Sequence, residues 1–148
     1  MPSKSLFIVF AALLVLGGCN KIDPNSPLGQ RQAIFKQMLK TSEDLGGMLR
    51  GRLKFDADAF ASGAVHLDEL SRQPWKHFPM VKEEHSNARD EVWQRQERFD
   101  ELARDLEAST AALAAASAVK PLLPETVAAP LQRVEDACEA CHKEFRDY

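Results

Sequence analysis

Two cysteines and a histidine stand close together near the C-terminus, in the order Cys138-Glu139-Ala140-Cys141-His142. This Cys-x-x-Cys-His spacing is the attachment sequence of c-type haem. On a helix, side chains three residues apart lie on one face, so both thiols can form thioethers with the vinyl groups of one haem. The next residue can then place an imidazole nitrogen on the iron. We therefore expect one covalently bound haem c, held by Cys138, Cys141 and the axial ligand His142.

The same two thiols have other uses in proteins. A redox-active Cys-x-x-Cys pair usually opens a helix in a βαβ setting, and no strand-like alternation here is long enough to build a sheet. A structural zinc site needs four ligands, whereas this segment offers two cysteines and one histidine. An inert structural disulfide between Cys138 and Cys141 stays open as an alternative.

Four amphipathic helices separated by breakers are predicted to position this motif. Apolar residues recur at three- and four-residue steps over about 30–51, 56–72, 88–118 and 125–146. The short-to-medium loops that join them predict an all-α fold, an antiparallel up-down-up-down four-helix bundle. In that topology the start of the first helix, the end of the second, the start of the third and the end of the fourth meet at one end, together with the aromatic loop 73–79.

The N-terminal segment is predicted to lie outside this bundle. Residues 6–16 form an apolar run that is typical of a signal peptide and too short to span a bilayer as a helix. Leu16-Gly17-Gly18-Cys19 resembles a bacterial lipobox, which implies a signal peptide over 1–18, a lipidated Cys19 and a flexible tether over 19–29. The protein would then be a membrane-anchored periplasmic lipoprotein of a Gram-negative bacterium. The alternative is ordinary signal cleavage, with Cys19 as a bystander.

The rest of the chain, residues 30–148, resembles the class II cytochromes c and, within them, the cytochrome c′ family. The resemblance rests on Arg31-Gln32-x-x-Phe35-Lys36, Phe55-Asp56, Trp75-x-x-Phe78-Pro79, Glu91-Val92-Trp93 with Phe99, and Cys138-x-x-Cys141-His142-x-x-Phe145-Arg146. Class I cytochromes c carry the haem motif near the N-terminus and use a later methionine as a ligand. No methionine follows Met80 here. The resemblance implies a cytochrome c′-like four-helix bundle over 30–148.

The resemblance also assigns surroundings to the haem. It implies that Phe35 occupies the distal position where low-spin relatives have a ligating methionine. It places Arg31 near a haem propionate and Arg146 near the proximal face, and the bundle topology brings Trp93 to the haem as well. For each arginine, the alternative is a solvated surface side chain.

The expected function depends on which residue lies at the sixth coordination position of the iron, and two functions are possible alternatives. With Phe35 there, we expect a five-coordinate, high-spin haem that binds NO and CO and serves NO scavenging or carriage. If Met38 or His85 ligates the iron instead, a six-coordinate, low-spin haem would make the protein a periplasmic electron carrier that serves redox partner proteins. A lipoprotein without haem would require the Cys-x-x-Cys-His motif to be accidental.

Other function classes are not indicated. We expect no enzyme, because no acid–base pair or nucleophile is placed near the haem motif. The formal net charge of −3 gives no sign of nucleic-acid binding. The family resemblance implies a homodimer through the first two helices, where Gly46-Gly47 would allow a close helix crossing.

Overall fold

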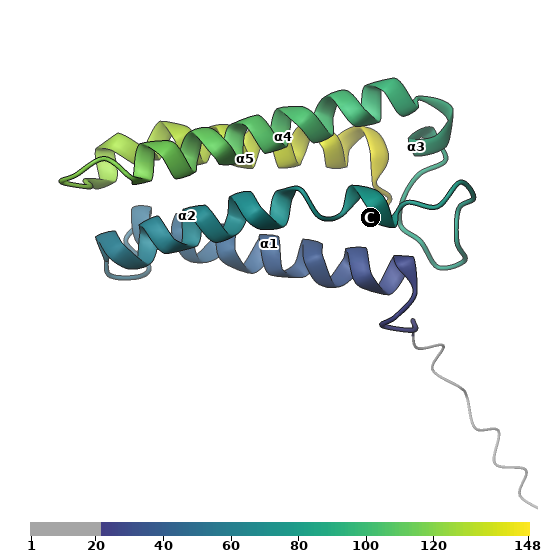
Figure 1. The fold of residues 1–148 in the computed structure, drawn as a ribbon, viewed down its shortest axis with the longest axis horizontal. Helices are drawn as coiled ribbons and strands as arrows, with labels where there is room; N and C mark the ends of the chain where they lie inside the picture. The colour runs from purple at the N-terminus through teal and green to yellow at the C-terminus, as the bar shows by residue number, and fades with distance from the viewer. Residues whose placement is uncertain (1–21) are drawn as a thin grey trace, which may run out of the picture.

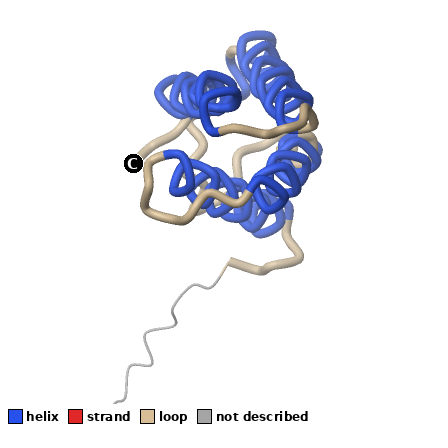
Figure 2. The backbone as a smooth tube through the Cα atoms, turned by 90° about the vertical axis from the view of Figure 1, so that its left-hand side faces the viewer, coloured by secondary structure: helices blue, strands red, loops and turns tan. Residues whose placement is uncertain are grey.

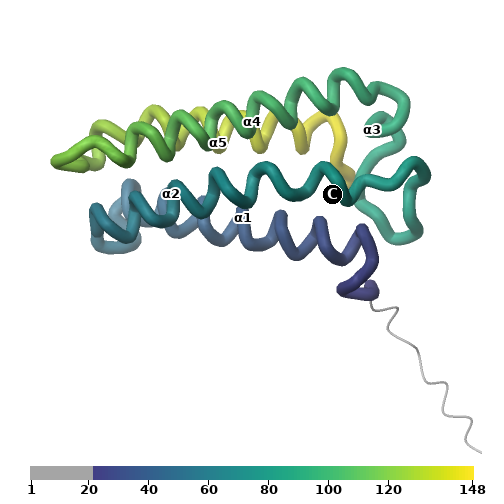
Figure 3. The backbone as a smooth tube through the Cα atoms, viewed as in Figure 1, coloured from purple at the N-terminus to yellow at the C-terminus, as the bar shows by residue number. Residues whose placement is uncertain are grey.

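Four long helices run side by side in the computed structural model, which describes residues 22–148 (Figure 1). They are α1 (Pro27–Leu49), α2 (Ala57–Ser71), α4 (Gln96–Ser117) and α5 (Pro124–Phe145). Two single turns, η1 (Trp75–His77) and α3 (Glu91–Gln94), lie between α2 and α4. Successive long helices pack on one another, and the colour gradient of the tube shows that they alternate in direction (Figure 3). This is the predicted antiparallel bundle.

Helix and loop account for the whole described chain (Figure 2). One isolated antiparallel bridge joins Ala88 to Arg146. Beside it, the backbone nitrogen of Arg89 donates to the carbonyl of Phe145 at 2.9 Å, which ties the loop before α3 to the end of α5. Within residues 22–148, no helix is both long enough and apolar enough to cross a membrane. The predicted signal peptide and Cys19 lie outside the described residues.

The first helix begins earlier than residue 30, where the sequence pattern placed its start. Ser26 caps it, since its Oγ accepts a hydrogen bond from the nitrogen of Gly29 at 3.0 Å. Pro27 occupies the first turn, where a missing N–H is tolerated. Leu28 is already buried. The last residues of the predicted 19–29 tether therefore belong to α1.

The single helix predicted over 88–118 is two helices, α3 and α4, because Arg95 leaves the helical conformation at φ −125° and ψ 48°. No glycine or proline causes the break. Arg95 instead reaches across to Glu144 on α5, with its Nη2 2.8 Å from a carboxylate oxygen. Arg98 binds the other oxygen of Glu144 at 2.9 Å. These ion pairs hold the start of α4 against the end of α5.

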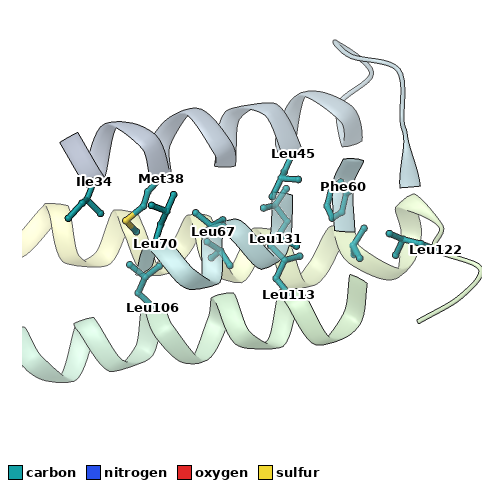
Figure 4. Packing of buried hydrophobic residues seen from close by; sticks show 13 residues of the cluster. Ile34, Met38, Leu45, Phe60, Leu67, Leu70, Leu106, Leu113, Leu122 and Leu131 are labelled. Atoms are coloured by element: carbon teal, nitrogen blue, oxygen red, sulfur yellow. The ribbon is translucent and has the colours of Figure 1, made fainter. Parts of the chain in front are cut away.

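The apolar stripes predicted from the helical spacing form the core. Figure 4 shows Met38 of α1, Leu70 of α2 and Leu106 of α4 pointing toward one another. A second, smaller cluster gathers Val92 with Phe99, Leu102 and Phe145 where α3, α4 and α5 meet. Trp75 packs against both clusters. The two clusters therefore meet at the end of the bundle where the haem motif lies.

The two adjacent glycines of α1 are not open to a partner. A Cβ atom at Gly46 would collide with the guanidinium of Arg50, and one at Gly47 would lie 3.1 Å from a side-chain carbon of Leu53. Both glycines are buried. The sequence suggested that a helix of a second copy of the chain packs closely on these glycines. In the structure, Arg50 and Leu53 of the same chain occupy that space.

Candidate functional site

A cavity of about 630 Å³ lies between α1 and α5 at the end of the bundle that carries the haem motif. This volume falls within the range of roughly 300–1,000 Å³ that is typical of ligand and cofactor pockets. The elements predicted to meet at this end all contribute apolar side chains to its wall, among them Leu28, Phe35, Leu67, Trp75, Phe78, Val92, Phe99 and Phe145. A wall of this kind suits the face of a haem.

Both cysteines of the motif line this cavity, half-buried and not joined in a disulfide. Burial, aided by the negative charge of Glu135, raises the pKa of Cys138 to about 11. Burial also raises the pKa of Cys141 to about 11, with smaller contributions from Cys138 and Glu144. A redox-active Cys-x-x-Cys pair depends on a lowered thiol pKa. The raised values therefore count against the redox alternative.

His142 lines the same cavity, one residue beyond Cys141. Burial, followed by the positive charge of Arg146, lowers the pKa of His142 below its usual value. The imidazole is therefore neutral at pH 7, which is the form that ligates a metal. Within the described residues, no three His, Cys, Asp or Glu side chains are grouped to hold a metal ion, so the zinc alternative finds no four-ligand site there.

Arg31 is a buried residue and not a solvated one, with only 3% of its surface exposed. Its guanidinium donates to both carboxylate oxygens of Glu83 at 2.8 and 2.9 Å. It also donates to the carbonyl oxygen of His77 and to Oγ of Ser86, both at 2.9 Å. It lies 4.5 Å above the ring of Phe78 as well. Arg31 thus fixes both ends of residues 77–86, a segment we call the strap.

Glu83 is the residue that the sequence pattern did not reveal. Its partner lies 52 positions away on α1, and no local spacing indicates a pair so distant. Partial burial alone would raise the pKa of Glu83, but the hydrogen bonds and charge of Arg31 outweigh it and hold that pKa below its ordinary value. The carboxylate therefore stays ionised at neutral pH and opposes the buried charge of Arg31.

Removing the Glu83 charge is expected to destabilise the protein. Glu83→Gln should lower the free energy of unfolding by about 2 kcal/mol. The variant leaves the buried charge of Arg31 without its partner, which costs several kcal/mol in a fully buried pair. The cost is smaller here because the side chain of Glu83 is partly exposed. A carboxyl whose folded pKa is depressed stabilises the fold above its unfolded pKa and loses this contribution as pH falls through the folded pKa. The wild type should therefore lose its advantage over the variant below about pH 4.

Denaturant unfolding at pH 7 and at pH 3 measures both effects. Glu84→Gln is the matched control, since Glu84 is exposed and the guanidinium of Arg31 pairs with its neighbour Glu83 instead. The Glu84 variant should unfold like the wild type at both pH values. Equal stability of the Glu83 variant and the wild type at pH 7 would contradict the role given to this pair.

Of the other predicted site residues, Phe35 and Arg146 line the cavity and Trp93 does not. Phe35 lines the cavity and packs edge-on against Trp75, with ring centroids 6.1 Å apart. Arg146 lies at the cavity edge, exposed, with its guanidinium 5.4 Å from the ring of Tyr148. Trp93 is not among the lining residues, and its neighbour Val92 takes that place. The indole of Trp93 instead donates to the carbonyl of Pro79 at 2.7 Å.

The two alternative iron ligands also differ in position. Met38 lines the cavity and is only 6% exposed. His85 is not among the lining residues; it borders a smaller recess with Ile22 and Glu84. Of the two, Met38 is therefore the one that the fold brings to the cavity.

Known proteins resemble this chain over nearly its whole length. A family model described as Cytochrome C′ matches residues 26–146. A cytochrome c′ of Rhodopseudomonas palustris is 29% identical over 145 residues, which cover 97% of this chain and 97% of that protein.

Solved structures show the same bundle. The cytochrome c prime from Shewanella frigidimarina is 25% identical, with a TM-score of 0.79 over 87% of this chain and 100% of that one. A variant of cytochrome c prime from Alcaligenes xylosoxidans, solved as a nitric oxide complex, is 23% identical, with a TM-score of 0.75 over 84% of this chain and 98% of that one. At this identity the second likeness concerns the fold alone.

Proposed function

Because this chain belongs to the cytochrome c′ family, whose members bind haem c covalently through cysteines, we propose that Cys138 and Cys141 form the two thioethers and that His142 is the axial iron ligand. The single observation that carries this assignment is that both thiols and a neutral imidazole line one apolar cavity of cofactor size. The haem supplies an iron that can bind a diatomic gas or change its oxidation state.

The distal side of this iron is assigned to Phe35. It lies on α1, across the cavity from the α5 residues that would hold the haem. A phenyl ring has no lone pair to donate, so it leaves the iron five-coordinate and high-spin. The packing of Phe35 on Trp75 and the apolar wall around it favour NO and CO over O₂, because bound O₂ gains from a distal hydrogen-bond donor. NO scavenging or carriage is the cellular role that this chemistry supports.

A second function has one observation in its favour. Met38 lines the cavity, and a thioether sulfur on the iron would give a six-coordinate, low-spin electron carrier. Against it, Met38 is turned into the core beside Leu70 and Leu106. Family members are haem-binding carrier proteins, which fits either function and assigns no turnover chemistry.

Absorption spectra separate the two. For a five-coordinate haem, the ferrous protein should show a broad high-spin spectrum that sharpens and shifts when CO is added. A low-spin ferrous spectrum that CO leaves unchanged would contradict this proposal and put the electron carrier in its place. The pyridine haemochrome of the same sample reports separately whether the haem is covalently bound.

Proteins of this family are typically periplasmic in Gram-negative bacteria. For this chain we add lipidation of Cys19, which the lipobox-like tetrapeptide supports. Two or more acyl chains anchor a protein stably where one is marginal. Cys19→Ser should release the protein from membranes or block its processing, as fractionation and the mass of the N-terminal peptide would show. Recovery of the wild type as a soluble, unmodified protein would contradict the anchor.

A homodimer through α1 and α2 stays a prediction from the family resemblance. Gly46 and Gly47 give it no support, because Arg50 and Leu53 cover them. Sedimentation of residues 20–148 at high concentration should show a dimer if the two helices pair. Monomer alone would remove the prediction.

A further inference from the structure

The strap exposes two adjacent apolar residues. Met80 and Val81 are 85% and 75% exposed, whereas Phe78 of the same strap is half-buried and lines the cavity. An isolated exposed apolar side chain is ordinary on a protein surface, whereas contiguous exposed apolar surface marks sites of membrane or partner contact. We call residues 80–82 the tip.

Hydrogen bonds hold the strap on each side of the tip. On one side, the indole of Trp93 holds the carbonyl of Pro79 at 2.7 Å. On the other, the buried guanidinium of Arg31 holds Glu83 and Ser86. Lys82 is linked to Asp90 at 3.0 Å as well. The apolar pair is therefore presented by an anchored loop, which reduces the entropy lost when it makes a contact.

The N-terminal end of the described chain lies against the same strap. Ile22 and Asp23 share a small recess with Glu83, Glu84 and His85. In Figure 1 the strap and the beginning of α1 occupy the same end of the bundle, and the α4–α5 connection lies at the other. The route of the chain toward Cys19 thus starts beside the tip.

Chain length limits how far Cys19 can be from this point. Only two residues, Asn20 and Lys21, separate it from Ile22. Consecutive Cα atoms are about 3.8 Å apart, so the Cα of Cys19 lies no more than about 11 Å from that of Ile22 in any conformation. A lipid on Cys19 would therefore hold the strap end of the bundle close to the bilayer surface.

From these observations we propose that the tip, through Met80 and Val81, contacts the lipid surface in the anchored protein. The proposal rests on the lipidation of Cys19 given above and is independent of the state of the iron. The exposed Lys76 and Lys82 are offset by Glu84 and Asp90, so the contact is mainly apolar. It sets the bundle with its cavity end toward the membrane and its α4–α5 connection away from it.

Depth-dependent quenching tests this orientation. In the lipidated holoprotein of the variant Met80→Cys, the new thiol is labelled with a fluorophore whose emission shifts to the blue when it leaves water. The protein is placed in vesicles of phosphatidylethanolamine and phosphatidylglycerol that carry bromine near the glycerol end of the acyl chains. Interfacial side chains insert about 5–10 Å, so the label at 80 should shift to the blue and lose fluorescence to bromine.

Val119→Cys is the matched control. Val119 is also apolar and 63% exposed, but it lies in the connection between α4 and α5. A label there should keep its aqueous spectrum and show no quenching. The wild type, which has no introduced cysteine, should take up no label, because its own cysteines carry lipid or haem. Label found on Cys138 or Cys141 of the wild type would show that the thioethers are missing, which is a separate failure from that of the membrane contact.

Three results would overturn the proposal. One is an aqueous, unquenched label at 80 in protein whose N-terminal lipid is confirmed by mass. Another is equal quenching at 80 and 119, which would mean that the bundle has no fixed orientation. The third is an N-terminus without lipid, which would remove the anchor and the membrane contact together while leaving the haem assignment intact.

Discussion

The double variant Cys138→Ser, Cys141→Ser should lose all covalently bound haem. A serine hydroxyl does not add to a haem vinyl group as a thiol does, and both thiols line the cavity with no other cysteine among the described residues to replace them. Mass spectrometry under denaturing conditions should give the mass of the apoprotein. Each single variant should keep one thioether, which shifts the pyridine haemochrome band toward that of a haem with one free vinyl group.

Ala140→Ser is the control for this experiment. It places the same hydroxyl inside the same motif, between the two cysteines, and leaves both thiols in place. The control should retain haem through denaturation. Haem that stays bound to the double variant under those conditions would mean that another residue attaches it, and the assignment of Cys138 and Cys141 would be wrong.

Replacing Phe35 by alanine should speed the binding of CO and NO to the ferrous protein. The ring lines the cavity from α1, and in the distal position proposed above it would stand in the path of a ligand approaching the iron. Such a ring opens the path by changing rotamer. Removal of a steric barrier of about 1.4 to 2.8 kcal/mol corresponds to roughly ten- to a hundredfold in rate. Flash photolysis of the CO complex measures this directly.

Two further variants define the role of Phe35. Leu39→Ala is the matched control, because Leu39 also lines the cavity from α1 but is 60% exposed at its edge; its rates should stay near those of the wild type. Phe35→Met should offer the iron a thioether and yield a low-spin haem that binds CO poorly. If Phe35→Ala bound CO no faster than the wild type, the ring would not lie on the path of the ligand.

The bundle and the cavity end could be predicted because they depend on local periodicity. Phe60, Leu67 and Leu131 are almost wholly buried, as the three- and four-residue spacing indicated. The same spacing placed Cys138 and Cys141 on the inner face of the last helix, where the structure has them. The antiparallel directions of the helices were predicted from their order and their short-to-medium loops. The meeting of four helix ends at one site could therefore be predicted without knowing any contact between distant residues.

What could not be predicted depends on contacts between distant segments. At the break, Arg95 pairs with Glu144 on another helix, and the residues around Arg95 are ordinary helix formers. The helical spacing also did not indicate that Val92 lines the cavity while the indole of Trp93 donates to the carbonyl of Pro79. The burial of Arg31 was hidden for the same reason, since its partner Glu83 belongs to a loop that no repeat pattern describes.

The cavity between α1 and α5 has a consequence for how the protein stays folded. Without the haem, the apolar side chains that line this volume of about 630 Å³ have no packing partners on that side, and unfilled space beside a core destabilises a fold. The haem is therefore part of the hydrophobic interior, and a cofactor held only by affinity would stabilise the fold less as it became scarce. Covalent attachment removes that dependence on supply, so the folded bundle keeps its filled interior at any dilution.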